Sequence, residues 1–532
     1  MTKENLGFNI VLKFQKPAGK ASMPLSLKLP KIDSNPILLA ETRSHKIESF
    51  IGNLPFGDPI RAATDLIEEL QNLNSQKVAY SNRLNALELY RPAGLQVFQD
   101  LIPHFSNASL PISRNELAFA DAASQLWQEF ALGYKSALMD LQNKILNINS
   151  TKSTALVVQR AIHAIKEQML VGYLTYKSTN EDIWNELHQL YFCAAHQNAD
   201  LLTLPDNAQP TNESSVGLVY TQACLMALAN PSHLSGADIL KTNGYLNRTA
   251  HLAELRALGL IDNPAGVFLI KLDSKSPPIP FSKNQAVPNP DTDILLVTVN
   301  LARTIHGHIK ALQGGTSLEG NLLPSDATQD NLDLLTQLIK HFGKPPLRVF
   351  NRSKKTDGVE LNVGIPAAFH GISKDTGASH PAGYPNSQRA SRWQVLNASA
   401  GGYSLRKFNS SVAAVHVGDI VTIKNLKAMQ WEVAVVRWAN INDLNQLDIG
   451  LQLISPSVSA VTINTVKGGI EEEALLLPEL GALKQPSTLI LSAGANAGDT
   501  IRMVCNGKES KLVLTKTMER TSMFTRFQYD LI

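Results

Sequence analysis

Two short groups of polar residues in the last third of the chain have the composition of a binding site for phosphates and bases. The first is the pair Arg348 and Arg352, four residues apart in the segment RVFNR, which directly follows a diproline and a leucine. An arginine carries a permanent charge, a planar fork of donors that fits phosphate oxygens or a guanine edge, and a flat face that stacks on a purine. The pair is therefore suited to close over a ligand that contains both phosphates and purines.

The second group is the segment NASAGG, which contains Asn397, Ser399 and Gly402 and lies between the strand-like runs WQVL and YSLR. Alternate residues of an extended strand point to the same side, so Asn397 and Ser399 would offer an amide and a hydroxyl to a base edge. Gly401 and Gly402 allow the backbone to turn sharply and to approach a ligand closely.

Each group also has a simpler interpretation. An RxxxR pair is often a solvated surface pair, and NxSxxG is an ordinary choice for a turn between strands. The order of the two groups and the strand-like run WEVAVVRW that follows them favour ligand binding. Arg389 and Arg392, just before the WQVL strand, form a second basic pair that could replace or assist the first, but their spacing is three rather than four.

Short β-prone runs at close spacing surround these residues. They predict a small antiparallel barrel over residues 345–460, and a further β-rich segment over 461–532 predicts a second small barrel or an extension of the first. The runs of the first barrel are Val359 to Val363, Trp393 to Leu396, Tyr403 to Leu405, Ile420 to Ile423, Trp431 to Trp438 and Ile449 to Ile454. Between Arg352 and Asn397 lie 44 residues, for which we expect a helix over Pro366 to Ile372 and a loop.

The part of the chain before the barrel is dominated by helical periodicity. We expect residues 1–45 to form a proline-bearing extended arm and residues 46–344 to form an α-helical domain, in which apolar residues recur every three or four positions. A more extended stretch interrupts the helices near 264–300. Besides the helix that follows Asp58, we expect helical segments at Leu117 to Ile148, Ser153 to Leu174, Ile183 to Ala195, Val216 to Ala229, Leu252 to Leu258 and Leu332 to Phe342. The fold class is thus multidomain α plus β.

The composition of the chain excludes several classes of protein. The 532 residues have a formal net charge of only +3, without long basic blocks, which argues against a dedicated DNA-binding protein. No stretch of 18 apolar residues occurs, so we expect no membrane insertion. Cys193, Cys224 and Cys505 lie far apart without metal-ligand spacing, which favours a reducing cytoplasm and predicts neither a metal site nor a cofactor. No phosphate-binding loop or nucleophile elbow is present, so the sequence predicts a binding protein and not an enzyme.

The two polar groups together resemble the signature of PilZ domains, RxxxR followed by [D/N]xSxxG on a β-barrel. VGDIVTIKN, WEVAVVRW and LDIGLQLISP resemble the strands that follow in such domains, and LPFGDPIRAATDLIEELQNLN resembles the helical region that precedes some of them in proteobacteria. The resemblance implies a receptor for the second messenger cyclic di-GMP. Arg348 and Arg352 would grip phosphates and guanines, Asn397 and Ser399 would contact a guanine, and Gly402 would permit the turn.

We therefore expect a cytoplasmic sensor in which cyclic di-GMP binds the barrel and the helical domain passes the signal to a protein partner. The alternative is a scaffold protein whose barrel is degenerate and binds no nucleotide. The helical segments contain no motif that identifies a partner or a downstream process.

Overall fold

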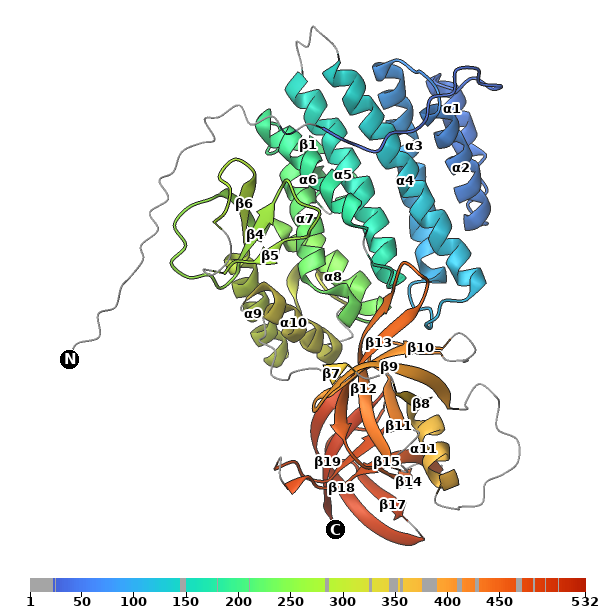
Figure 1. Cartoon of the computed structure of the whole chain (residues 1–532), viewed down its shortest axis with the longest axis vertical. Helices are drawn as coiled ribbons and strands as arrows, with labels where there is room; N and C mark the ends of the chain where they lie inside the picture. The colour runs from blue at the N-terminus through green and yellow to red at the C-terminus, as the bar shows by residue number, and fades with distance from the viewer. Residues whose placement is uncertain are drawn as a thin grey trace, which may run out of the picture.

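The computed structural model describes residues 23 and 25–532 apart from 144–149, 179, 210, 283–286, 325–327, 344–352, 355–356, 376–389, 409–413, 426–429, 466–470, 482–483, 493 and 506. Helices fill the upper part of the molecule in Figure 1, and two stacked β-domains fill the lower part, with the C-terminus at the far end. The multidomain α plus β architecture that the sequence predicts is therefore confirmed.

Ten α-helices lie within the described part of the chain before residue 343. The longest, α4, begins with a capping box in which Ser113 and Glu116 satisfy each other's free backbone amides. Asp58 caps α2 by accepting from the Arg61 amide, and Pro59 takes the first helical position. The helices are α1 (Ser44–Gly52), α2 (Pro59–Asn74), α3 (Tyr80–Leu101), α4 (Arg114–Gln142), α5 (Ser150–Leu174), α6 (Glu181–His196), α7 (Val216–Leu228), α8 (Gly236–Thr249), α9 (Val299–Gln313) and α10 (Thr328–Phe342).

A four-stranded sheet is inserted between α8 and α9. Its order is β3 (Glu254–Ala257), β6 (Asp293–Val297), β4 (Val267–Lys271) and β5 (Ile279–Pro280), and all neighbours are antiparallel. The extended stretch near 264–300 is confirmed, but the helix expected over 252–258 is wrong, because residues 254–257 form an edge strand beside β6. A two-residue ladder joins β1 (Leu204–Pro205) to β2 (Glu213–Ser214).

The middle β-domain is a closed ring of six antiparallel strands. Around the ring the order is β8 (Gly358–Val363), β9 (Ser391–Ser399), β10 (Gly402–Lys407), β13 (Leu447–Ser455), β12 (Trp431–Ile441) and β11 (Ile420–Asn425), and β11 pairs again with β8. The short β7 (Ser353–Lys354) adds to β9 beside β8. The expected helix over 366–372 is confirmed as part of α11 (Gly364–Asp375).

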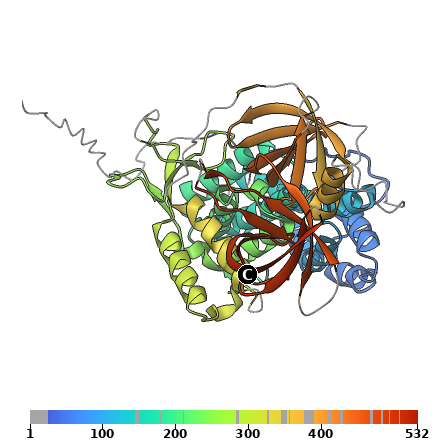
Figure 2. The same ribbon diagram turned by 90° about the horizontal axis from the view of Figure 1, so that it is seen from below.

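The C-terminal β-domain is a second closed barrel, with the order β14 (Ser459–Thr465), β15 (Glu471–Leu477), β16 (Thr488–Leu491), β19 (Thr525–Leu531), β18 (Lys508–Arg520) and β17 (Thr500–Cys505). Of the two possibilities left open by the sequence, a second barrel is correct. The junction expected at 460/461 falls inside β14, which pairs with β15 and β17. From below, this barrel lies in front of the helices (Figure 2).

Two backbone bridges join the helical domain to the middle barrel. The connection between α3 and α4 pairs Leu110 with Val415 through two hydrogen bonds of 2.9 and 3.0 Å. The connection between α5 and α6 meets the end of β12, where the Ile441 amide donates to the Tyr176 carbonyl at 2.7 Å. One continuous apolar core runs from the helices into the lumen of the middle barrel. In the described ranges no helix is long and apolar enough to cross a membrane.

Candidate ligand-binding site

The outer face of the middle barrel brings the second polar group together with residues from two other strands. Val395, Tyr403, Leu405 and Leu451 face the lumen or its mouth. The residues that alternate with Tyr403, Leu405 and Leu451 on β10 and β13 therefore face outward. A register shift in β9 at Leu396 places Asn397 opposite the outward Ser404, although Asn397 lies only two residues after Val395. Cross-strand pairing then places one outward row across four strands, and the row consists of Asn397 on β9, Ser404 on β10, Gly450 on β13 and Trp438 on β12.

Trp438 packs against this row. A Cβ atom on Gly450 would collide with the Trp438 indole nitrogen, so the ring covers the glycine directly. Trp438 as a whole is half-buried, so the residue is not fully covered by the protein. A β-bulge between Val436 and Trp438 places two residues of β12 opposite the single Gly450, and Arg437 therefore reaches the outer face together with Trp438.

A second outward row lies next to the first and consists of Ser399, Gly402 and Gln452. Gly402 has a φ of +148°, and a Cβ atom there would collide with the carbonyl oxygen of Leu451. Glycine is thus required where β10 begins and closes against β13. The Ser399 hydroxyl accepts from the Gly401 amide at 3.3 Å, and Asn397 has no side-chain hydrogen bond to a residue that the structure describes.

The charged groups of the face are arranged at its borders. Arg406 forms a two-pronged ion pair with Asp448, at 2.7 Å for both hydrogen bonds. The pair with Asp448 raises the pKa of Arg406. Arg437 donates from Nε to the Gln452 side chain at 2.7 Å and forms an ion pair with Glu519 of the C-terminal barrel. Of these two arginines, Arg406 is neutralised within the middle barrel, whereas Arg437 is paired by another domain.

The arginine pair of the sequence signature, Arg348 and Arg352, lies outside the described residues, and so does Arg389. Ser353, the next residue after Arg352, belongs to β7. It pairs with Ala398 of β9, which is next to Asn397. Arg392 stands at the start of β9, five residues before Asn397, which corresponds to roughly 16 Å of extended strand. Ser353 therefore lies on the Asn397 side of the barrel, and Arg392 lies at the other end of β9.

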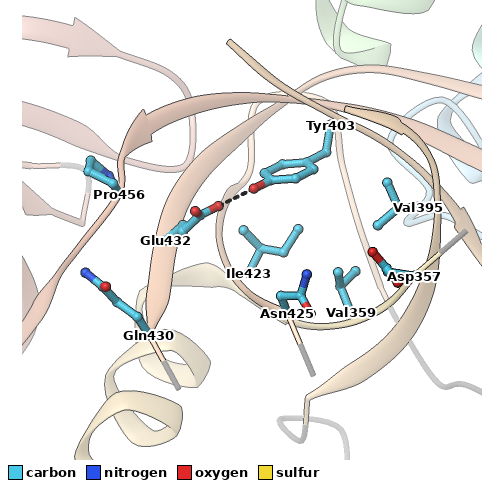
Figure 3. Close-up of a pocket in the computed structure, with 9 residues that line it drawn as sticks. All are labelled: Asp357, Val359, Val395, Tyr403, Ile423, Asn425, Gln430, Glu432 and Pro456. Carbon is cyan, nitrogen blue, oxygen red and sulfur yellow. Dashed lines mark hydrogen bonds between the residues drawn. The ribbon is translucent and has the colours of Figure 1, made fainter. Parts of the chain in front are cut away.

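A cavity of about 200 Å³ opens at the mouth of the barrel lumen (Figure 3). Val359, Val395 and Ile423 form its apolar wall. Across it the Tyr403 hydroxyl donates to the Glu432 carboxylate at 2.6 Å, and burial together with this bond raises the pKa of Tyr403. The remaining lining residues are Asp357, Asn425, Gln430 and Pro456. Two carboxylates beside the opening make this cavity a poor place for a phosphate, so the outer face is the better candidate.

The outer face offers the groups that a purine nucleotide needs. Trp438 supplies an aromatic surface for stacking, and Asn397 supplies donors and an acceptor in the same row. Sequence reasoning missed Trp438, Gly450 and Gln452. The run VVRW and the glycine in LDIGLQL were visible, but only the pairing of β12 with β13 places the tryptophan over that glycine.

Comparison with known proteins gives three family matches in chain order. The N-terminal domain of the cyclic-di-GMP receptor FimW matches residues 45–258, its middle PilZ domain matches residues 371–459, and the FimW C-terminal β-barrel domain matches residues 462–532. The cyclic-di-GMP receptor FimW of Pseudomonas aeruginosa PAO1 is 22% identical, over 95% of this chain and 93% of that protein.

Proposed function

Because the chain belongs to the FimW family, in which a PilZ domain stands between a helical domain and a C-terminal barrel, we propose that it is a receptor for cyclic di-GMP. The ligand binds on the outer face of the middle barrel. The observation that carries this proposal is the row in which Trp438, packed on Gly450, shares one face with Asn397.

One guanine stacks on the exposed part of the Trp438 ring, because a purine and an indole are both flat and apolar on their faces. The Asn397 amide and the Ser399 hydroxyl meet the edge of a guanine, where donors and acceptors alternate. Gly402 has no side chain, so nothing projects from the face between Ser399 and Gln452. Arg348 and Arg352 bind the phosphates, and the pairing of Ser353 with Ala398 supports their access to this face.

Binding is coupled to the helical domain through β12. This strand carries Trp438 on the outer face and ends at Ile441, whose backbone bonds the connection between α5 and α6. A protein partner that contacts the helical domain would respond to changes at this junction. The three cysteines form no disulfide, which fits a cytoplasmic receptor.

Isothermal titration calorimetry with cyclic di-GMP tests the proposal. The double variant Asn397→Ala/Ser399→Ala should weaken binding about tenfold to a hundredfold, since each lost hydrogen bond costs about 0.5–1.5 kcal/mol. Arg348→Ala/Arg352→Ala should weaken it about a hundredfold or more, because charge-assisted bonds are stronger. Arg389→Ala/Arg392→Ala is the matched control, since it removes the same charge from the other basic pair and should leave the affinity unchanged.

The results of these titrations distinguish a receptor from a scaffold protein, and one basic pair from the other. If the wild-type protein binds neither cyclic di-GMP nor cyclic GMP-AMP, it is a scaffold with a degenerate barrel. If the Arg389/Arg392 variant loses affinity while the Arg348/Arg352 variant keeps it, the second basic pair supplies the phosphate contacts.

A further inference from the structure

Arg437 is held by the C-terminal barrel at the border of the proposed binding face. Its guanidinium donates to Gln452 within the middle barrel and forms an ion pair with Glu519 at the end of β18. The two side chains of this ion pair are 35% and 20% exposed. An ion pair that is partly open to water contributes little to stability. A competing anion can therefore replace Glu519 as the partner of Arg437.

The position of Arg437 relative to the face is fixed by two neighbours. Along β12 it is followed directly by Trp438, and the bulge turns both side chains outward. Across the sheet it bonds Gln452, which lies opposite Gly402 in the row of Ser399. The guanidinium thus lies beside both rows of the binding face, where a ligand with two phosphates would present negative charge.

Glu519 has a second cationic neighbour, so its release from Arg437 does not leave it without a counter-charge. It lies opposite Arg526 in the β18 and β19 pairing. Burial lowers the pKa of Arg526 and the charge of Glu519 opposes that shift, while Arg526 Nε donates to Thr488 at 2.9 Å. Because Arg526 remains in place, the cost of breaking the contact with Arg437 stays small.

The same end of the C-terminal barrel touches the middle barrel next to Arg437. Thr521, two residues after Glu519, lies next to Gly418, where a Cβ atom would be 3.7 Å from the Thr521 Cβ. The Gly418 amide in turn donates to the carbonyl of Val436 at 2.8 Å. A movement of the β18 end would therefore reach the bulge that carries Arg437 through the contacts of Gly418 with Thr521 and Val436.

We propose that Arg437 is a ligand contact shared between two partners: it binds a phosphate of cyclic di-GMP when Glu519 releases it, and it holds the β18 end of the C-terminal barrel when the ligand is absent. The C-terminal barrel therefore lowers ligand affinity, and the ligand loosens the contact between the barrels. This inference rests on the proposed function.

The test is calorimetry with cyclic di-GMP on four variants. Glu519→Gln keeps the shape of the side chain and removes its charge, and it should tighten binding about three- to tenfold. Arg437→Ala should weaken binding about tenfold, and the double variant should bind like Arg437→Ala alone. The matched control is Glu509→Gln, which removes the same charge from an exposed ion pair with Arg502 in the same barrel and should bind like the wild type.

Hydrogen exchange provides a second measurement that does not depend on the affinity change. Addition of cyclic di-GMP should speed amide exchange in residues 517–521 of the wild-type protein and leave it unchanged in Arg437→Ala. The inference is wrong if Glu519→Gln binds like the wild type and like Glu509→Gln while Trp438→Ala loses affinity. A wild-type protein that does not bind cyclic di-GMP would instead refute the proposed function itself.

Discussion

Replacement of Trp438 by alanine tests the stacking contribution of the proposed binding face. The ring covers Gly450, is half-buried, and is not part of the barrel lumen. Stacking of one base on an aromatic side chain is worth about 1–3 kcal/mol. Since about 1.4 kcal/mol corresponds to a tenfold change in affinity, Trp438→Ala should weaken cyclic di-GMP binding about 5- to 150-fold. Trp438→Phe keeps a flat ring and should remain within about fivefold of the wild type.

Calorimetry at constant salt measures this change, and thermal unfolding of the same samples reports whether the barrel stays folded. Gly450→Ala provides a second route to the same site, because its methyl group would push the indole away without altering the indole itself. Phe408→Ala is the matched control, since it removes a 43% exposed ring next to the far end of β10. The stacking model is refuted if Trp438→Ala binds as tightly as Phe408→Ala.

Three further predictions concern stability. Gly402→Ala should destabilise the protein by about 1–3 kcal/mol in chemical denaturation, because its positive φ and the nearby Leu451 carbonyl exclude a Cβ atom. The hydrogen bond with Asp419 raises the pKa of His416 above its usual 6.5. The pair therefore contributes its full stabilisation of the folded state below pH 6.5 and loses it as the pH rises through the raised pKa. The unfolding temperature of the His416→Gln variant should lack that pH dependence. Asp206→Ala should cost about 3–5 kcal/mol by the same denaturation assay, because Asp206 is the buried partner of Arg91.

The sequence predicted the elements of the middle barrel better than it predicted their faces. Short alternating runs identify strands because every second residue must be apolar toward the lumen. Strict alternation, however, would place Arg437 and Trp438 on opposite sides of β12. The bulge that turns both outward depends on the pairing with β13, and no local pattern specifies that pairing.

The same limit explains the error at residues 252–258. The segment HLAELRALGL has leucines at helical spacing, yet residues 254–257 form an edge strand because β6 offers a complementary edge 40 residues later in the sequence. In the proposed binding site, Asn397, Ser399 and Gly402 are recognisable from their order and their turn chemistry. The contact between Arg437 and Glu519 joins residues of different barrels and could only be found in the three-dimensional structure.

The way in which the helical domain is attached limits how a ligand can act on it. The helices and the middle barrel share one apolar core, and two backbone bridges reinforce that contact. Separation of these parts would expose a large apolar area, and each Å² exposed costs about 25 cal/mol of free energy. A few ligand contacts cannot supply that free energy. A change along β12 needs less free energy, because Ile441 lies only three positions after Trp438, about 10 Å along the strand. A shift of the bulge on ligand binding would therefore move the Ile441 end against Tyr176 and reach the helices without undocking them.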